Sequence, residues 1–377
     1  MKALVYEDYG PPEVLKLQDV VKPVPGDGEI RVRVRAAAVT TADSAFRKGD
    51  RFSTRLASGL RRPRKRVLGT EFAGDVEAVG NGVTHFRPGD AVFAATGVAF
   101  GAHGEFVCLR EDGAVAHMPS NMTHDEAAAL CDGAMTALPF LRDHGRVQRG
   151  QTVLVNGASG SVGSAAVQLA RYYGAHVIAV CSTGNVDRVR ALGADEVIDY
   201  TREDFTRRRG AYHVVFDVVG KSSFSRCEDA LTDGGIYLST VPTLGMLADM
   251  LWTRFFGSRK AILALTGLRP PGEKRKDLCF LRELAETGRL RAVIDGRYPW
   301  EDSAQAHRRV DSGHKQGTVV LQMGAGRERV SWRQSDVASE GNAERERTVS
   351  FANRATVQAG VPSLTVHATG QARSGGC

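Results

Sequence analysis

A glycine-rich turn between an apolar strand and a helix constrains the fold of this chain more than any other feature. Thr152–Asn156 has the composition of a buried strand, and residues 161–173 have that of an Ala- and Leu-rich helix. The connection contains Gly157 and Gly160, and Gly163 follows in the first helical turn. Glycines let backbone N–H groups approach a pyrophosphate, and the start of a helix offers further N–H groups. The spacing is G-x-x-G-x-x-G instead of the commoner G-x-G-x-x-G, so the strand and helix around it matter most. We predict a dinucleotide site; a structural turn without a ligand is the alternative.

Strand and helix sequences alternate after this turn, which predicts a doubly wound parallel sheet covered by helices on both faces. We expect strands at 176–181, 197–198, 213–219, 235–239 and 260–265, with helices at 186–192 and 222–231. The first third instead contains short strands, at 30–36, 72–79 and 91–94, separated by turns such as Asn81-Gly82. Such a pattern favours a small β-barrel.

The sequence divides into four segments. Residues 1–123 are the first part of a barrel domain, 124–266 are the nucleotide-binding domain, and 267–323 return to the barrel domain. Residues 324–377 are rich in Gly, Ser, Ala, Arg and Glu without a sustained period, so we predict a mostly disordered tail. Further helices are expected at 277–288 and 303–312, and a last strand at 317–323.

An insert at 242–258 separates two expected strands of the parallel sheet. Leu244, Leu247, Met250, Leu251 and Phe255 fit one stripe of a helix. This stripe would line the substrate pocket or pair two subunits. Packing into the core is the alternative, and for any single residue it is the favoured one.

Composition and charge are those of an ordinary globular protein, with 42% hydrophobic and 25% charged residues. The formal net charge of +7 suits an anionic cofactor. The basic run 61–66 has no aromatic or groove-reading context nearby, so we interpret it as a solvated loop and expect no nucleic-acid partner. No apolar run reaches about 18 residues, so no membrane span is expected.

The cysteines and the N-terminal residues favour a cytoplasmic protein. None of the six cysteines forms a C-x-x-C pair, which suggests reduced thiols instead of a disulfide framework. The first residues reach Glu7 too soon for a signal peptide.

The end of the second expected strand of the parallel sheet bears on the choice of dinucleotide. NAD sites usually carry Asp or Glu there to bind the ribose 2′-hydroxyl. Here Cys181 is followed by Ser182 and Thr183, and Arg188 follows on the next helix. Hydroxyls and a guanidinium can bind a 2′-phosphate. We therefore favour NADPH, with NADH as the alternative; Arg188 could equally be a solvent-facing helix residue.

These motifs resemble those of the medium-chain dehydrogenase/reductase superfamily, from residue 1 to about 323. The similar branch is that of the zinc-independent, zeta-crystallin-like quinone oxidoreductases, with related enoyl reductases and NAD(P)-dependent alcohol dehydrogenase-like proteins. The resemblance implies an α/β fold with a GroES-like β-barrel catalytic domain and a Rossmann domain, with the active site between them. It also implies a small-molecule substrate and a homodimer. The matching segments are residues 1–3, 9–15, 68–74, 79–80, 87–92, 156–163, 192–195, 198–200 and 217–220.

The resemblance argues against a catalytic zinc. Zinc-dependent members carry Cys where this chain has Thr40, and His where it has Thr70. The chain keeps Asp43 and Glu71 but lacks the four-cysteine loop of the structural zinc. Hydroxyls are poor zinc ligands compared with thiolate and imidazole. We therefore expect no metal.

The resemblance also implies a set of cofactor contacts. The pyrophosphate would lie against the turn, and the adenosine ribose against the residues after the second strand. The nicotinamide would lie beside two further strand ends and a closing stretch near residue 317. The residues are Gly157, Ser159, Gly160, Ser161, Val162, Gly163, Ser182, Thr183, Arg188, Tyr200, Val218, Val219, Gly220, Ser239, Thr240, Val241, Gly317 and Thr318.

The expected reaction is hydride transfer from the nicotinamide to a quinone, an enone or a reactive carbonyl. Without a metal, hydrogen-bond donors must polarise the acceptor oxygen. Thr40 is the first candidate for this catalytic role and Thr41 the second. Many relatives have Asn at the position of Thr40, and Thr40 could equally be an ordinary strand-end residue. No activated His or carboxylate pair is evident, so we expect no obligatory general base. The alternatives are a weakly catalytic NADPH-binding sensor or structural protein and, third, a zinc alcohol dehydrogenase.

Overall fold

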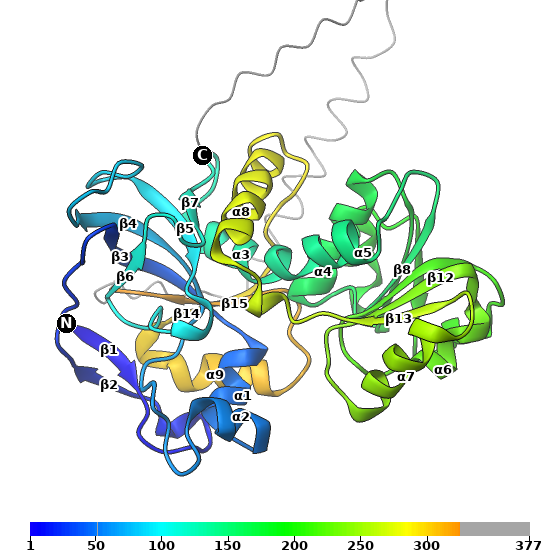
Figure 1. Cartoon of the computed structure of the whole chain (residues 1–377), viewed down its shortest axis with the longest axis horizontal. Coiled ribbons are helices and arrows are strands. Elements are labelled where there is room, and N and C mark those ends of the chain that lie inside the picture. Colours follow the sequence, from blue (N-terminus) through cyan, green and yellow to red (C-terminus); the bar gives the residue numbers. More distant parts are fainter. Residues whose placement is uncertain (51, 325–377) are drawn as a thin grey trace, which may run out of the picture. The chain divides into compact units, whose positions relative to one another are not determined.

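The computed structural model describes residues 1–50 and 52–324, without the side chain of Ser53. Residues Met1–Gly324 form one compact unit, shown in Figure 1. The tail predicted at 324–377 falls, apart from Gly324, outside the described residues. The two large sheets of the compact unit are one parallel sheet and one mainly antiparallel sheet. The α/β fold with a GroES-like domain and a Rossmann-type sheet is therefore confirmed, whereas the exact domain boundaries stay a prediction.

The Rossmann sheet consists of six parallel strands, β8 (Thr152–Asn156), β9 (His176–Cys181), β10 (Glu196–Asp199), β11 (Tyr212–Asp217), β12 (Leu231–Ser239) and β13 (Lys260–Leu263). Its helices are α4 (Ser161–Tyr172), α5 (Val186–Ala191), α6 (Phe224–Cys227) and α7 (Leu244–Phe255). The strands pair in the order β10-β9-β8-β11-β12-β13. Val153 and Val155 pack in one core cluster with the apolar face of α4, whereas Leu154 packs with Phe224 and Met246 in another. Helices thus cover both faces, as the alternating sequence predicts.

The GroES-like domain is built on a second sheet, which contains β3 (Glu29–Val39), β4 (Glu71–Val79), β5 (Ala91–Ala95), β6 (Phe106–Arg110), β7 (Val115–His117), β14 (Ile294–Pro299) and β15 (Thr318–Gln322). Strands β1 (Lys2–Val5) and β2 (Lys16–Asp19) form a separate pair. The order is β14-β15-β3-β4-β5-β7, with β6 also paired to β3. Ile30, Val32 and Val34 on β3 are buried, whereas Arg33 and Arg35 are exposed, so this strand alternates between a core face and a solvent face. Val319 of β15 lies opposite Val39 of β3, so the last described strand completes a sheet begun near the N-terminus.

One long helix, α3 (His124–Pro139), lies between the two sheets (Figure 1). Thr123 and Glu126 form a capping box at its start, in which each side chain bonds to the other residue's backbone N–H. Its buried alanines let it approach β3, β4 and β15 on one side and α4 on the other. A Cβ atom on Gly133 would lie 2.2 Å from the carbonyl oxygen of Ser161, so α3 and α4 touch backbone to backbone.

Several elements differ from those expected. The β-rich first third also contains α1 (Thr41–Lys48) and α2 (Phe52–Ser58). The helix expected at 222–231 is only the short α6 followed by a 3-10 turn over Glu228–Ala230, and Leu231 already belongs to β12. Helix α8 (Pro271–Glu286) begins six residues earlier than expected, with Pro271 at its first position, where proline needs no N–H partner. Helix α9 (Ser303–Asp311) matches the prediction closely.

The helical insert is confirmed as α7, but its stripe does not pack into the core. Leu244, Leu247, Leu251 and Phe255 are all exposed, and Met246 and Thr253 are the buried residues of this helix. The favoured expectation of core packing for single residues of the stripe was therefore wrong. The residues that anchor α7 lie on its opposite face.

Within the described part of the chain, no helix is long and apolar enough to cross a membrane. Cys108, Cys131, Cys181 and Cys227 are free thiols.

Candidate active site

The predicted cofactor residues gather at the carboxyl edge of the Rossmann sheet. Asp217 at the end of β11 lies opposite Asn156 of β8 and Ser239 of β12. The turns that follow these strands therefore meet at one edge, where dinucleotides bind in open parallel sheets. The predicted residues in these turns and at the start of α4 are Gly157, Ser159, Gly160, Ser161, Val162, Gly163, Ser182, Thr183, Val218, Val219, Gly220, Ser239, Thr240 and Val241.

The glycine-rich turn has no room for side chains at two positions. Gly157 has a φ of +87°, and a Cβ there would lie 2.6 Å from Cγ1 of Val219. A Cβ on Gly163 would lie 2.1 Å from the carbonyl oxygen of Gly157. Gly160 is the N-cap of α4, and no side chain caps this helix. The turn thus presents the first N–H groups of a 12-residue helix without a side-chain acceptor.

A buried carboxylate holds the neighbouring turn in place. Asp217 accepts hydrogen bonds from the backbone N–H groups of Val219 (3.1 Å), Gly220 (2.9 Å) and Ser222 (2.9 Å). It also accepts from the Tyr237 hydroxyl (3.0 Å) and from Nδ2 of Asn156 (3.0 Å). Burial, together with the Asp217 charge, raises the pKa of Tyr237 far above its usual value. Asp217 thereby fixes the backbone of residues 218–220. Its position at a strand end did not by itself predict this role.

The third turn is tied to the second. The Thr240 hydroxyl donates to the carbonyl oxygen of Val218 at 3.2 Å. Oγ of Ser239 accepts from the N–H of Val241 at 3.2 Å. A Cβ on Gly220 would lie 2.6 Å from Cγ2 of Val241. Residues 218–220 and 239–241 therefore form one connected wall of the site.

The residues expected around the adenosine ribose have a carboxylate among them. The Thr183 hydroxyl donates to Asp199 Oδ2 at 2.6 Å. Hydrogen bonds from Thr183 and Thr201 hold the pKa of Asp199 below its usual value, so this carboxylate is charged at neutral pH. Nδ2 of Asn185 donates to Oγ of Ser182 at 2.9 Å. A carboxylate from the end of β10 thus lies beside Thr183 although no acid follows β9, and the sequence reasoning missed this contact.

Arg188 and Tyr200 lie at the margin of this region. The Arg188 guanidinium donates to the carbonyl oxygen of Gln316 at 2.9 Å and to its side-chain oxygen at 3.1 Å. Tyr200 is exposed, and its N–H donates to the carbonyl oxygen of Cys181 at 3.1 Å. Arg188 thus joins α5 to the segment before β15.

The two candidate catalytic threonines differ in their hydrogen bonding. Thr40 is buried at the N-cap of α1, where its hydroxyl donates to Asp43 Oδ2 (2.8 Å) and accepts from the Asp43 N–H (3.0 Å). Oδ1 of Asp43 accepts from the Gly69 N–H at 2.9 Å. Thr41 is exposed, and its hydroxyl has no hydrogen-bond partner among the residues described. Thr41 is therefore the freer donor.

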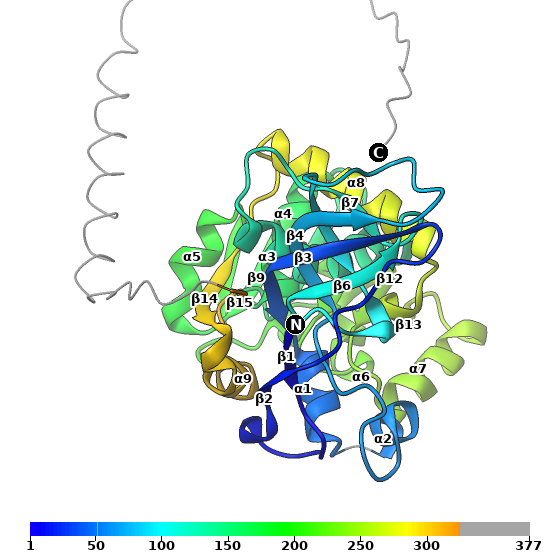
Figure 2. The ribbon, with the colours of Figure 1, turned by 90° about the vertical axis from the view of Figure 1, so that its left-hand side faces the viewer.

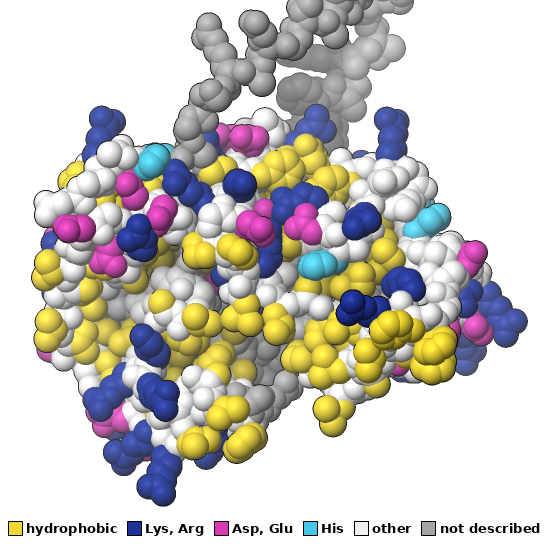
Figure 3. Space-filling view, in the orientation of Figure 1, with side chains coloured by type: hydrophobic (Ala, Val, Ile, Leu, Met, Phe, Trp, Pro, Cys, Tyr) yellow, Lys and Arg dark blue, Asp and Glu magenta, His cyan; other side chains and the backbone are white. Residues whose placement is uncertain are grey.

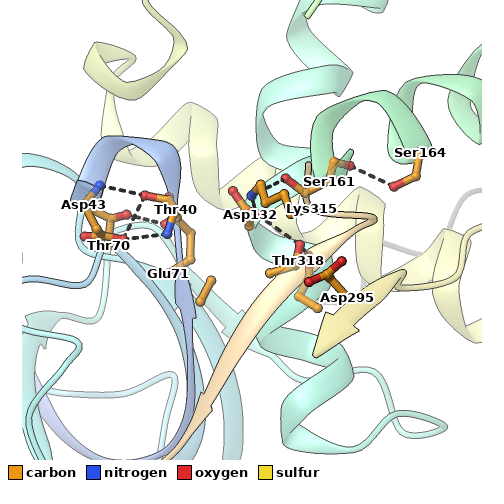
Figure 4. Close-up of polar contacts among 12 residues, drawn as sticks. Thr40, Asp43, Thr70, Glu71, Asp132, Ser161, Ser164, Asp295, Lys315 and Thr318 are labelled. Carbon is orange, nitrogen blue, oxygen red and sulfur yellow. Dashed lines mark hydrogen bonds and ion pairs between the residues drawn. The ribbon is translucent and has the colours of Figure 1, made fainter. Parts of the chain in front are cut away.

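A carboxyl group with a raised pKa lies in the same part of the site as Thr40 (Figure 4). The Thr70 hydroxyl donates to the carboxyl group of Glu71 at the start of β4. Burial and repulsion from Asp132 and Asp43 raise the pKa of Glu71 to about 8, against the opposing effects of Thr70 and Lys274. Glu71 is therefore mainly uncharged at neutral pH. Figure 4 shows Thr40, Asp43, Thr70 and Glu71 as one group of side chains.

A second polar group joins the GroES-like domain to the start of α4 (Figure 4). Lys315 Nζ donates to Oγ of Ser161 at 3.2 Å and lies 3.6 Å from Oδ2 of Asp132. The buried Thr318 hydroxyl donates to Oδ2 of Asp132 at 3.0 Å. Gly317, directly before β15, lies against the backbone of Val293. Sequence reasoning missed Asp132 and Lys315, because residues so far apart in the chain meet only after folding.

Among the described residues, no group of three or more His, Cys, Asp or Glu side chains is arranged to hold a metal ion. The side chains in the two positions compared with zinc ligands, Thr40 and Thr70, are instead bonded to neighbouring carboxyl groups.

Comparisons with known proteins agree with this architecture. The alcohol dehydrogenase GroES-like domain family matches residues 26–120, and the zinc-binding dehydrogenase family matches 192–321. A quinone oxidoreductase of Pseudomonas aeruginosa is 33% identical over 339 residues, covering 85% of this chain and 99% of that protein. An NADPH-dependent alkenal/one oxidoreductase of Arabidopsis thaliana is 31% identical, covering 85% and 79%.

A solved structure gives the same result. The quinone oxidoreductase from Coxiella burnetii has a TM-score of 0.74 and 29% identity, covering 85% of this chain and 99% of that one. With these sheets, this glycine-rich turn and these relatives, the chain belongs to the quinone oxidoreductase branch of the medium-chain dehydrogenase/reductase superfamily.

Proposed function

We propose that this NAD(P)H-dependent reductase uses NADPH to reduce a quinone, an enone or another reactive carbonyl compound without zinc. The observation that carries the proposal is the turn before α4. Gly157 and Gly163 leave no space for a Cβ, and no side chain caps the helix. Such a surface of backbone N–H groups fits the pyrophosphate of a dinucleotide.

The chain's residues would divide the work as follows. The amides of residues 160–163 bind the pyrophosphate, with the ammonium of Lys315 beside Ser161 adding positive charge. Residues 218–220 and 239–241 form the wall that orients the nicotinamide, which supplies the hydride when bound. Thr41 would donate a hydrogen bond to the acceptor oxygen of the substrate. Thr40 would do so only after giving up its hydrogen bond to Asp43.

The choice between NADPH and NADH rests on opposing features. The hydroxyls of Ser182 and Thr183 suit a 2′-phosphate, and one relative is named as NADPH-dependent. The Asp199 carboxylate, bonded to Thr183, repels a 2′-phosphate and suits a ribose hydroxyl. We propose NADPH as the main cofactor, with NADH accepted.

The absence of zinc is likewise part of the proposal. One matching family is described as zinc-binding, but Thr40 and Thr70 are poor ligands and both hydroxyls are bonded to carboxyl groups. A zinc alcohol dehydrogenase is the weaker alternative. The bonded hydroxyl of Thr40 also favours a second candidate, an NADPH-binding protein of low turnover. A cytoplasmic location and a homodimer stay predictions.

The decisive experiment measures oxidation of NADPH and NADH with 1,4-benzoquinone, phenanthrenequinone and an enal, alongside the metal content of the protein. Turnover of at least one acceptor, faster with NADPH and without bound zinc, supports the proposal. NADPH binding without turnover of any acceptor favours the sensor, and stoichiometric zinc with alcohol oxidation favours the third candidate. No binding of either nicotinamide would reject all three.

A further inference from the structure

Lys315 places a cation at the end of α4 where a cation is least stable. Its Nζ donates to Oγ of Ser161, the first residue of α4, at 3.2 Å, and its side chain is only 13% exposed. The N-terminus of a helix carries a partial positive charge, so an ammonium group there is destabilised unless an anion lies nearby. The first turn of α4 contains no acidic residue. The position of Lys315 therefore requires negative charge from another element.

Asp132 on α3 supplies this negative charge. Its Oδ2 lies 3.6 Å from Lys315 Nζ and accepts a hydrogen bond from the Thr318 hydroxyl at 3.0 Å. Thr318 is the first residue of β15 and is buried, so its hydroxyl is a fixed donor. Among the described residues, no side chain caps the first N–H groups of α4. The carboxylate thus holds the lysine and leaves these N–H groups for a phosphate.

The packing of α3 brings Asp132 to this place. Gly133 follows it, and a Cβ on Gly133 would lie 2.2 Å from the carbonyl oxygen of Ser161. A side chain at that position would therefore push α3 away from the start of α4. Figures 1 and 2, two views at right angles, show α3 between β15 and α4, and it packs against both. Residues far apart in the chain thus meet at the start of α4.

The backbone beside Lys315 is fixed without help from Asp132. The N–H of Gln316 donates to Oδ1 of Asp295 at 2.5 Å, and its carbonyl oxygen accepts from Arg188 at 2.9 Å. These bonds determine where the lysine side chain begins. The side chain itself is flexible, so the carboxylate of Asp132 determines where its ammonium group lies.

We propose that Asp132 and Thr318 are positioning residues that hold the Lys315 ammonium group against the start of α4, where it binds the cofactor pyrophosphate. This inference rests on the dinucleotide site of the proposed function and gives Asp132 and Thr318 a role in it. The phosphates supply the negative charge that favours both the helix N-terminus and the lysine. NADPH and NADH share this pyrophosphate, so Lys315 should contribute equally to the binding of both.

An effect of total charge would be less specific. The formal net charge is +7, and Figure 3 shows Lys and Arg side chains scattered over the visible face. If total charge alone attracted the cofactor, removing any exposed cation would weaken binding. Lys16 on β2 is exposed and serves as the control for Lys315. Asp125 lies on the same helix as Asp132, is paired with Arg297 at 2.9 Å, and serves as the control for Asp132.

The test measures dissociation constants for NADPH and NADH by cofactor fluorescence, and kcat at saturating cofactor. Lys315→Met should weaken the binding of both nicotinamides by about tenfold and reduce its salt dependence. Asp132→Asn and Thr318→Val should each weaken both by about threefold, with kcat unchanged. Lys16→Met and Asp125→Asn should bind like the wild type.

Two further measurements separate positioning from damage to the fold. Adenosine 2′-monophosphate lacks the pyrophosphate, so its competition with NADPH should give the same inhibition constant in every variant. If Asp132 acts through Lys315, adding Asp132→Asn to Lys315→Met should weaken binding no further. Should thermal melts show that Asp132→Asn is unfolded, Thr318→Val and Lys315→Met still decide the question.

Several results would overturn the proposal. Tighter binding in Asp132→Asn would mean that the carboxylate only repels the phosphates. Losses that multiply in the double variant would mean that Asp132 acts independently of the lysine. Binding unchanged in Lys315→Met would mean that the ammonium group does not reach the pyrophosphate. In each case the wild type still binds cofactor, whereas a wild type that binds neither nicotinamide would reject the proposed function itself.

Discussion

Thr40 and Thr41 are neighbours in the chain, but the structure gives their hydroxyls different surroundings. The proton of the Thr40 hydroxyl points to a buried carboxylate, and its oxygen caps α1. The Thr41 hydroxyl is exposed. Sequence reasoning ranks Thr40 first as the donor to substrate, whereas the hydrogen bonds favour Thr41.

Valine substitutions should separate stability from turnover. Thr40→Val removes a helix cap and should lower the free energy of unfolding by about 1 kcal/mol. Thr41→Val should leave the melting temperature unchanged and lower kcat severalfold at unchanged NADPH affinity. Thermal melts and steady-state kinetics measure both effects. If only Thr40→Val lowers kcat, then Thr40 is the donor.

Glu71 should make stability depend on pH. Its pKa is raised to about 8 in the folded protein, whereas a free Glu titrates near 4.3. Between these values the folded state keeps a proton that the unfolded state releases, so stability should fall as pH rises through this window. Glu71→Gln should remove about 3 kcal/mol of the stability difference between pH 5 and 8.5.

Denaturant unfolding at both pH values measures this effect. Glu77→Gln on the same strand is the matched control, because ion pairs with Lys22 and Arg31 hold the pKa of Glu77 below its usual value. Glu77 is therefore already charged throughout the window. An unchanged pH dependence in Glu71→Gln would mean that Glu71 is charged in the folded protein.

Asp199 should govern the discrimination between the two nicotinamides. Replacing its carboxylate by an amide keeps a hydrogen-bond partner for Thr183 and removes the negative charge. Asp199→Asn should tighten NADPH binding severalfold and leave NADH binding unchanged or weaker, as measured by cofactor fluorescence. Asp187→Asn, on the neighbouring helix α5, is the charge-matched control. Equal effects of the two variants would show that only overall charge matters.

Among the elements, the turn before α4 tolerates substitution least. Gly163→Ala would place a Cβ 2.1 Å from the carbonyl oxygen of Gly157 and should destabilise the fold by about 2 kcal/mol. Gly160→Ala meets the same oxygen at an ordinary 3.7 Å and should keep the stability of the wild type. Thermal melts compare the two variants. Equal stability would mean that the turn relaxes more easily than its geometry indicates.

Elements with strong local patterns could be predicted from the sequence. Residues close together in the chain determine the strand-turn-helix at 152–172 and the alternation of buried and exposed side chains in β3. Helix α6 is shorter than the pattern predicts, and the last residue of the predicted helix, Leu231, belongs instead to β12, which pairs with β11 and β13. The outward stripe of α7 has the same period as a buried one, so periodicity alone could not show which way it faces.

The candidate site likewise has some features that the sequence predicts and others that it does not. The turns of the site follow from strand ends, but two acidic residues and one lysine do not. Asp199 reaches Thr183, and Asp132 reaches Lys315, across sixteen or more positions of sequence. Pairings of this kind depend on the register of sheets and on domain packing, which no local pattern encodes.

At the scale of the whole molecule, the compact unit contains both segments that match known families, residues 26–120 and 192–321. Residues Met1–Gly324 form that unit, and the match to the P. aeruginosa relative covers 85% of this chain but 99% of that protein. Deleting residues 325–377 should therefore leave the melting temperature and kcat unchanged. A calorimetric scan and the quinone assay test this. A marked loss of either would give the segment a part in folding or catalysis.

Helix α3 touches both sheets and lies in backbone contact with α4 at Gly133. Neither sheet can therefore open without exposing an apolar side of this shared helix, and the protein should melt in one cooperative transition. Occupation of the turn before α4 would then slow hydrogen exchange even in β3, on the far side of α3. Slower amide exchange in β3 would therefore report cofactor binding at a turn that β3 does not contact.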